Sequence, residues 1–153
     1  MLTSIEGNFN NIEVHRLLIK HFIELRAASP EGSTHVLDID GLKHSSIKFW
    51  SLWENKNLAG CGALKFLNNE HGEFKSIRVH DTFRRKGFGI EIIKLLIKEA
   101  QNLNIKQISI ETGAGDFFIP ARKLFENCGF KPCKPFAHYK EDINSIYLTK
   151  LIS

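Results

Sequence analysis

The stretch that decides the fold reads Phe74-Lys-Ser-Ile-Arg-Val-His80, then Asp81-Thr-Phe-Arg-Arg-Lys-Gly-Phe-Gly89, then Ile90-Glu-Ile-Ile-Lys-Leu-Leu-Ile-Lys-Glu-Ala100. In the first part, even-numbered residues are expected to face one side and odd-numbered residues the other, which is typical of a short strand with a buried face. The last part has the spacing of an amphipathic helix, with its apolar face formed by Ile90, Ile93, Leu96, Ile97, Ala100 and Leu103.

A cationic, glycine-rich turn joins this strand to this helix. It consists of Arg84, Arg85 and Lys86, followed by Gly87 and Gly89. The first backbone N–H groups of a helix have no partner within the helix and carry positive dipole charge, so they stabilise an anion. Glycine lets a ligand approach that backbone closely. The turn therefore predicts a site for a polyanion such as a pyrophosphate.

Two common phosphate-binding motifs do not fit this turn. The dinucleotide fingerprint needs a third glycine where this chain has Ile92, and no Gly-x-x-x-x-Gly-Lys-Ser/Thr sequence occurs anywhere. The pattern that remains is Arg84-x-x-Gly87-x-Gly89. The alternative interpretation is a solvated basic loop with no ligand.

Length and composition predict one globular domain spanning residues 1–153. The chain is 42% hydrophobic and 25% charged, and its formal net charge is +4. Part of this positive charge lies at residues 84–86, where a phosphate ligand already accounts for it. No basic tract interleaved with aromatic residues is present, so we expect no nucleic-acid partner.

The sequence also favours a cytoplasmic protein without membrane or metal. No apolar run reaches the ~20 residues of a membrane span, and the N-terminus lacks the pattern of a signal peptide. The odd number of cysteines, three, argues against a disulfide framework and for reduced thiols. Cys128, Cys133 and His138 supply only three ligands without Cys-x-x-Cys spacing, so no metal is expected.

The remaining pattern predicts an α/β fold with one mixed sheet of six or seven strands and three or four helices. Helices are expected at 10–28, with Asn10 or Asn11 as the N-cap, at 88–103 and at 120–127. His21 on the first helix is interpreted as a half-buried core histidine. Gly60 and Gly62 suggest a bulge or a close backbone approach. Strands are expected at 2–6, 47–53, 58–67, 73–80, 106–112, 130–136 and 145–151.

This order of elements and two of its motifs resemble the GNAT superfamily of N-acetyltransferases over the whole chain. The motifs are Arg84-x-x-Gly87-x-Gly89 and Ala121-Arg-Lys-Leu-Phe-Glu-Asn-Cys-Gly-Phe130. The chain is most similar to a subgroup of small bacterial acetyltransferases linked to indole-acetic-acid metabolism. That similarity is carried by Ser29-Pro30, Gly60-Cys-Gly-Ala-Leu64, Glu73-Phe-Lys-Ser76, Glu111-Thr-Gly113, Pro132-Cys-Lys-Pro-Phe136 and Tyr139.

The resemblance implies the acyl-CoA N-acyltransferase fold and acetyl transfer from acetyl-CoA, the co-substrate, to a primary amine. The amine would attack directly in a ternary complex, and coenzyme A would lie in a gap between strands 74–80 and 106–112. Donors aimed at the developing oxyanion would lower the barrier. The cofactor-binding residues it implies are Ile77, Arg78, Val79, Arg84, Arg85, Lys86, Gly87, Phe88, Gly89, Ile90, Thr112, Arg122 and Phe125.

The resemblance also suggests catalytic residues, with departures from the family pattern. Glu73 is the expected general base, and the alternative is an exposed carboxylate at the end of a strand. Phe125 and Phe118 stand where the family often has a tyrosine acid and an asparagine. Tyr139 is the substitute candidate for the acid, although a packing role is equally compatible.

The acceptor is less defined by the sequence. Glu31, His35 and His138 are candidate substrate residues on two flanking loops. The acceptor is expected to be a small amine or amino-acid-like molecule, on a monomer or a homodimer. A protein or peptide acetyltransferase, and a coenzyme A sensor without catalysis, are the alternatives.

Overall fold

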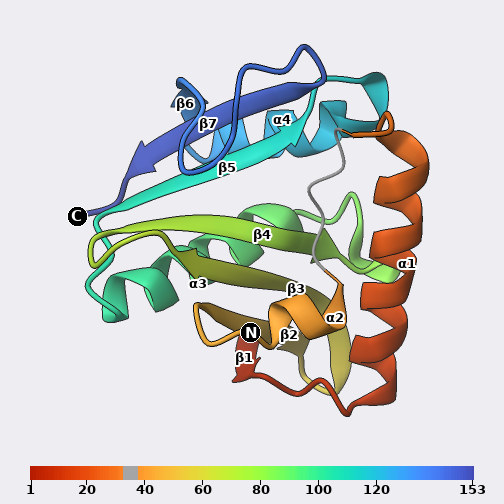
Figure 1. Cartoon of the computed structure of the whole chain (residues 1–153). Helices are drawn as coiled ribbons and strands as arrows, with labels where there is room; N and C mark the ends of the chain where they lie inside the picture. Colours follow the sequence, from red (N-terminus) through yellow and green to blue (C-terminus); the bar gives the residue numbers. More distant parts are fainter. Residues whose placement is uncertain (33–37) are drawn as a thin grey trace.

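A computed structural model describes residues 1–32 and 38–153. Seven strands form one sheet in the order β1-β2-β3-β4-β5-β7-β6 (Figure 1). Of these neighbours only β4 and β5 run parallel, joined by the crossover helix α3. The expected mixed sheet is confirmed. The strands are β1 Leu2–Glu6, β2 Ile47–Glu54, β3 Asn57–Phe66, β4 His71–Val79, β5 Gln107–Gly113, β6 Lys131–Pro132 and β7 Ser145–Leu151.

Helices cover both faces of the sheet. Helix α1 begins at Ile12 because the Asn11 side chain accepts hydrogen bonds from the N–H groups of Glu13 and Val14 at 2.9 and 3.2 Å. The short helix α2 was not expected, and it is capped by Asp38, which accepts from Gly41 N–H at 2.8 Å. The helices are α1 Ile12–Ala28, α2 Ile39–Leu42, α3 Phe88–Asn102 and α4 Ile119–Asn127.

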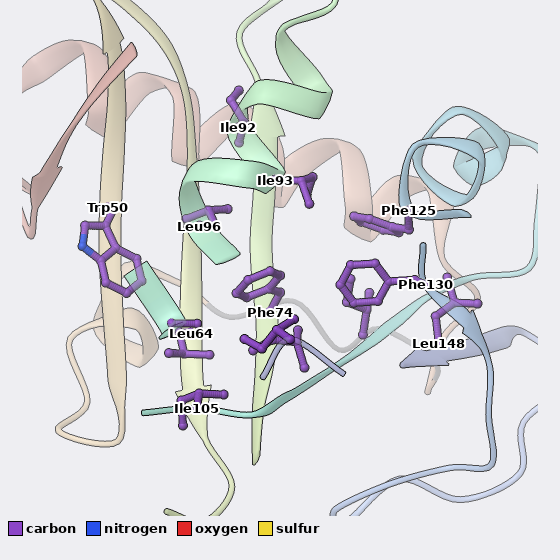
Figure 2. Close-up of a cluster of buried hydrophobic side chains, with 14 of the residues drawn as sticks. Trp50, Leu64, Phe74, Ile92, Ile93, Leu96, Ile105, Phe125, Phe130 and Leu148 are labelled. Carbon is purple, nitrogen blue, oxygen red and sulfur yellow. The ribbon is translucent and has the colours of Figure 1, made fainter. Parts of the chain in front are cut away.

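The hydrophobic core has two parts, one on each face of the sheet. On one face α3 and α4 bury the cluster of Figure 2, in which Leu64, Phe74 and Leu96 meet Phe125 and Phe130. On the other face α1 and α2 pack over β2 and β3. That second cluster comprises Val14, Leu17, Leu18, Phe22, Leu42, Phe49, Trp53, Leu58, Cys61 and Ala63.

The segment before the last strand differs from expectation. We expected a strand over 130–136, but only Lys131–Pro132 pairs with β7. Pro132 and Pro135 have no backbone N–H to donate to a ladder, which limits pairing to a short edge. The chain from 133 to 144 instead folds over β5 and β7, where the rings of Phe136 and Tyr139 contact Tyr147.

A bulge interrupts β4, so its expected strict alternation is wrong. Ser76 has a φ of +55°, and the pairing with β3 shifts by one residue between Cys61 and Ala63. As a result, Phe74 and Ile77 both pack on the α3 face. The predicted close approach at Gly60 is confirmed, because a Cβ there would lie 2.3 Å from a carbonyl oxygen of β4.

Candidate functional site

The two parallel strands part from each other a short distance along their length. β4 pairs with β5 only from His71 to Glu73, opposite 107–109. Beyond Glu73 a cleft of about 490 Å³ opens between them, and residues of α1, the start of α3 and α4 also line it. Figure 1 shows where these elements lie in the fold. The gap expected between these strands is therefore present.

One end of the cleft is formed by the glycine turn that begins α3. Gly87 is the N-cap of α3 with a φ of +81°, and its helix start has no side-chain cap among the residues that the structure describes. The N–H groups of the first turn are thus free of protein side-chain acceptors there. Arg84, Arg85 and Gly89 line the cleft beside them. The other predicted residues of this turn, Lys86, Gly87, Phe88 and Ile90, adjoin the cleft in the chain without lining it.

The cleft is also lined by most of the other predicted cofactor residues, Ile77, Arg78, Val79, Thr112 and Phe125. The Arg78 side chain is 5% exposed, and its guanidinium lies 2.5 Å from the Glu24 carboxylate on α1. Because the guanidinium forms this ion pair with α1, Arg78 can contact a ligand in the cleft mainly through its backbone groups.

Arg122 does not line the cleft. Its Nη1 donates to the carbonyl oxygens of Gly113 and Gly115 at 2.8 and 2.9 Å. It therefore holds the loop that follows β5.

Three residues at this cleft have buried polar atoms without a hydrogen-bond partner among residues 1–32 and 38–153. His21 is 4% exposed, and within the described part of the chain both of its ring nitrogens lack a hydrogen bond, as do Ser76 Oγ and Arg78 Nε. All three residues line the cleft. Burial, aided by the Arg78 guanidinium, lowers the pKa of His21 to about 4. His21 is therefore neutral near pH 7, and it is more deeply buried than the sequence led us to expect.

Glu73 lies where β4 and β5 separate, in a network with Tyr139 and Lys75. Tyr139 Oη donates to Glu73 Oε2 at 2.5 Å, and Lys75 Nζ lies 3.0 Å from that hydroxyl and 3.3 Å from Oε2. Glu73 is 2% exposed, so it is not an exposed carboxylate at a strand end. Burial and the charge of Glu73 raise the pKa of Tyr139, which keeps its hydroxyl protonated as the donor.

A second cavity of about 550 Å³ meets the cleft at Glu73 and Lys75, which line both. We call it the acceptor-side pocket. Among the predicted acceptor residues His138 lines it, whereas Glu31 is exposed and lines neither cavity. His35 lies outside the described residues. The other residues lining the pocket are Gly32, Lys65, Ala137, Tyr139, Lys140, Glu141, Asp142 and Tyr147.

Sequence reasoning missed Lys65 and Lys75. Residues two apart on a strand share a face, so the spacing of Glu73 and Lys75 was a usable signal. Lys65 pairs in register with Glu73 across β3 and β4, and this register depends on the turn between the two strands, whose geometry the sequence does not specify in detail.

Within residues 1–32 and 38–153, no group of three or more His, Cys, Asp or Glu side chains is arranged to hold a metal ion. In the same part of the chain, no helix is long and apolar enough to cross a membrane.

Comparison with known proteins points to one family. The profile of the acetyltransferase (GNAT) family matches residues 12–130. The chain is 44% identical over 138 residues to the uncharacterized N-acetyltransferase YsnE of Bacillus subtilis, covering 90% of this chain and 91% of that one. It is 27% identical over 122 residues to the IAA acetyltransferase of Azospirillum brasilense, covering 79% and 78%.

A solved structure shares the fold. It is a spermidine N-acetyltransferase from Vibrio cholerae in complex with CoA and spermine. Its TM-score is 0.71 at 19% identity, and the match covers 98% of this chain and 95% of that one.

Proposed function

Because this chain belongs to the GNAT acetyltransferase family and is an acetyl-CoA-dependent N-acetyltransferase, we propose that it acetylates a primary amine of a small or amino-acid-like molecule. The amine attacks the thioester directly while both substrates are bound. The observation that carries this proposal is the position of Glu73, a buried carboxylate that lines both the cleft and the acceptor-side pocket.

Acetyl-CoA occupies the cleft in this proposal. Its pyrophosphate lies on the N–H groups that open α3, beside Arg84 and Arg85, because an anion is stabilised at a helix N-terminus. Its pantetheine arm runs along the bulged part of β4, and the thioester reaches the point where β4 and β5 part. A solved structure of the same fold, a spermidine N-acetyltransferase, is in complex with CoA and spermine, which supports the view that this fold can bind coenzyme A and an amine together.

Glu73 acts as the general base. Most amines are protonated near pH 7 and must lose a proton before they attack, and a carboxylate within reach removes it. The nitrogen then forms a bond to the thioester carbonyl carbon, and the carbon–sulfur bond breaks. Glu73 takes one proton from the ammonium group before the attack and passes it to solvent. After the attack the nitrogen loses a second proton to solvent, and the coenzyme A thiolate takes up one proton from water. Phe125 at the cleft cannot supply one.

Tyr139 and Lys75 position this base. The Tyr139 hydroxyl donates to one oxygen of the Glu73 carboxylate, Oε2, and Lys75 lies beside the same oxygen. Among the described residues, neither of these two side chains contacts the other oxygen, Oε1, so Oε1 is the oxygen that we assign to the amine. Because the raised pKa of Tyr139 keeps its hydroxyl protonated, this residue orients Glu73 across the working pH range.

The test measures thiol release from acetyl-CoA with a panel of amines, amino acids and polyamines, for the wild type and for Glu73→Gln. We expect at least one amine to be acetylated, and Glu73→Gln to lower kcat mainly below the pKa of that amine. Glu70→Gln is the matched control, since Glu70 is exposed at the preceding turn. If the pH–rate profile of Glu73→Gln equals that of the wild type, Glu73 is not the base.

The same panel separates the alternatives. Turnover with peptides and not with small amines would favour a protein acetyltransferase, and binding of acetyl-CoA without any turnover would favour a sensor. We further propose that the enzyme works in the cytoplasm as a monomer or a homodimer. The three free cysteines support a reducing compartment.

A further inference from the structure

The acceptor-side pocket has a charge pattern that bears on the chemistry of the acceptor. It contains three lysines, Lys65, Lys75 and Lys140. Lys75 is already committed, because its ammonium lies beside Glu73 and the Tyr139 hydroxyl. The other two lysines carry positive charge that the network around Glu73 does not use.

Lys65 is the better placed of these two. It lies directly opposite Glu73 in the antiparallel register of β3 and β4, and it is half-buried. Side chains that pair in this way have Cβ atoms about 5 Å apart. Among the described residues, no carboxylate lies within ion-pair distance of Lys65 or of the exposed Lys140. A half-buried lysine without an acidic partner, on the wall of a substrate pocket, is suited to an anionic group of the substrate.

The acidic residues of the pocket do not offer an equivalent site for a second ammonium group. Asp142 accepts a hydrogen bond from the Asn144 N–H at 2.8 Å, and this hydrogen bond stabilises the loop that contains both residues. Glu141 is exposed. An acceptor with several ammonium groups would therefore meet Lys65 where it needs a carboxylate, and like charges in a pocket cost affinity.

We propose that the acceptor is an amine that also carries a carboxylate, such as an amino acid, with its amine at Glu73 and its carboxylate at Lys65. The inference rests on the function proposed above and names the substrate class of the same site. It predicts discrimination against polyamines, although a relative of the same fold was solved with spermine.

The test compares each amino acid that is acetylated with its own carboxamide, which keeps the amine and removes the negative charge. For the wild type we expect kcat/KM to be about tenfold higher for the acid, the factor that corresponds to about 1.4 kcal/mol. Spermidine should be a poorer substrate than the acid. Lys65→Met should remove the preference for the acid, so that the ratio of kcat/KM for acid and carboxamide falls to about one.

Controls separate this charge effect from a folding defect. Lys65→Arg should keep the preference, and Lys48→Met should behave as the wild type, because Lys48 lies on β2 outside both cavities. Thermal melting checks that each variant is folded. If acid and carboxamide react equally with the wild type, or if Lys65→Met keeps the preference, this inference is wrong while the proposed activity stands. If no amine is acetylated, the proposed function itself fails.

Discussion

Replacing His21 with leucine should change how the stability of this protein depends on pH. His21 is 4% exposed, and burial together with Arg78 lowers its pKa from the ordinary 6.5 to about 4. Between these two values the unfolded chain binds a proton at His21 and the folded protein does not. The contribution of neutral His21 to the free energy of unfolding is therefore fully present above pH 6.5, and it is lost as the pH falls towards 4.

The size of the effect follows from the two pKa values. A difference of about 2.5 pKa units limits the total loss to about 3.4 kcal/mol, and about 2 kcal/mol of this is lost between pH 7.5 and pH 5. For a domain of this size, 2 kcal/mol corresponds to a fall in Tm of about 4–8 °C. In His21→Leu this contribution is absent. The variant should therefore lose about 2 kcal/mol less stability than the wild type between pH 7.5 and pH 5.

The assay is urea denaturation of the wild type and the variant at pH 7.5 and pH 5. The loss of unfolding free energy between pH 7.5 and pH 5 is compared between the two proteins, so that the contributions of all other titrating groups cancel. His15→Leu is the control, because His15 lies exposed on the same helix, and it should lose as much stability as the wild type. An equal loss in His21→Leu and wild type would show that His21 is not held neutral by burial, and the reasoning would be refuted.

Three further predictions follow from other contacts. Gly60→Ala would place a Cβ 2.3 Å from a carbonyl oxygen of β4. This clash should lower the free energy of unfolding by about 1–3 kcal/mol and the Tm in a thermal melt by about 2–12 °C. An unchanged Tm would contradict the close approach. Arg122→Met removes two hydrogen bonds to loop carbonyls, so amide hydrogen exchange over 113–118 should become faster, and unchanged protection would mean that other contacts hold this loop. Tyr139→Phe removes the hydrogen bond to Glu73. Because a hydrogen bond to a charged group contributes about 1.5–3 kcal/mol, kcat should fall about tenfold to a hundredfold. The KM for acetyl-CoA should stay the same, and a change in KM alone would argue against a role of Tyr139 in positioning the base.

The fold could be predicted from the sequence to a large extent, because its signals are local. The helical spacing of 88–103 and the side-chain cap at Asn11 each depend on residues close together in the chain. The glycine turn at Gly87 is of the same kind, since a left-handed N-cap strongly favours glycine. Together with the order of the elements, these signals were sufficient to predict the mixed sheet and to recognise the resemblance to the GNAT family, which the match to the family profile supports.

The sequence by itself thus determined the order of the main strands and helices, the glycine turn that begins α3 and the candidate base. Only the tertiary structure decided what surrounds Glu73: Tyr139 is 66 residues away in the chain, and Lys65 comes opposite through strand register. It also decided the bulge at Ser76 and the deep burial of His21. The physical reason is that periodicity and capping depend on neighbouring residues, whereas contacts, burial and pKa shifts depend on packing between segments that are distant in the chain.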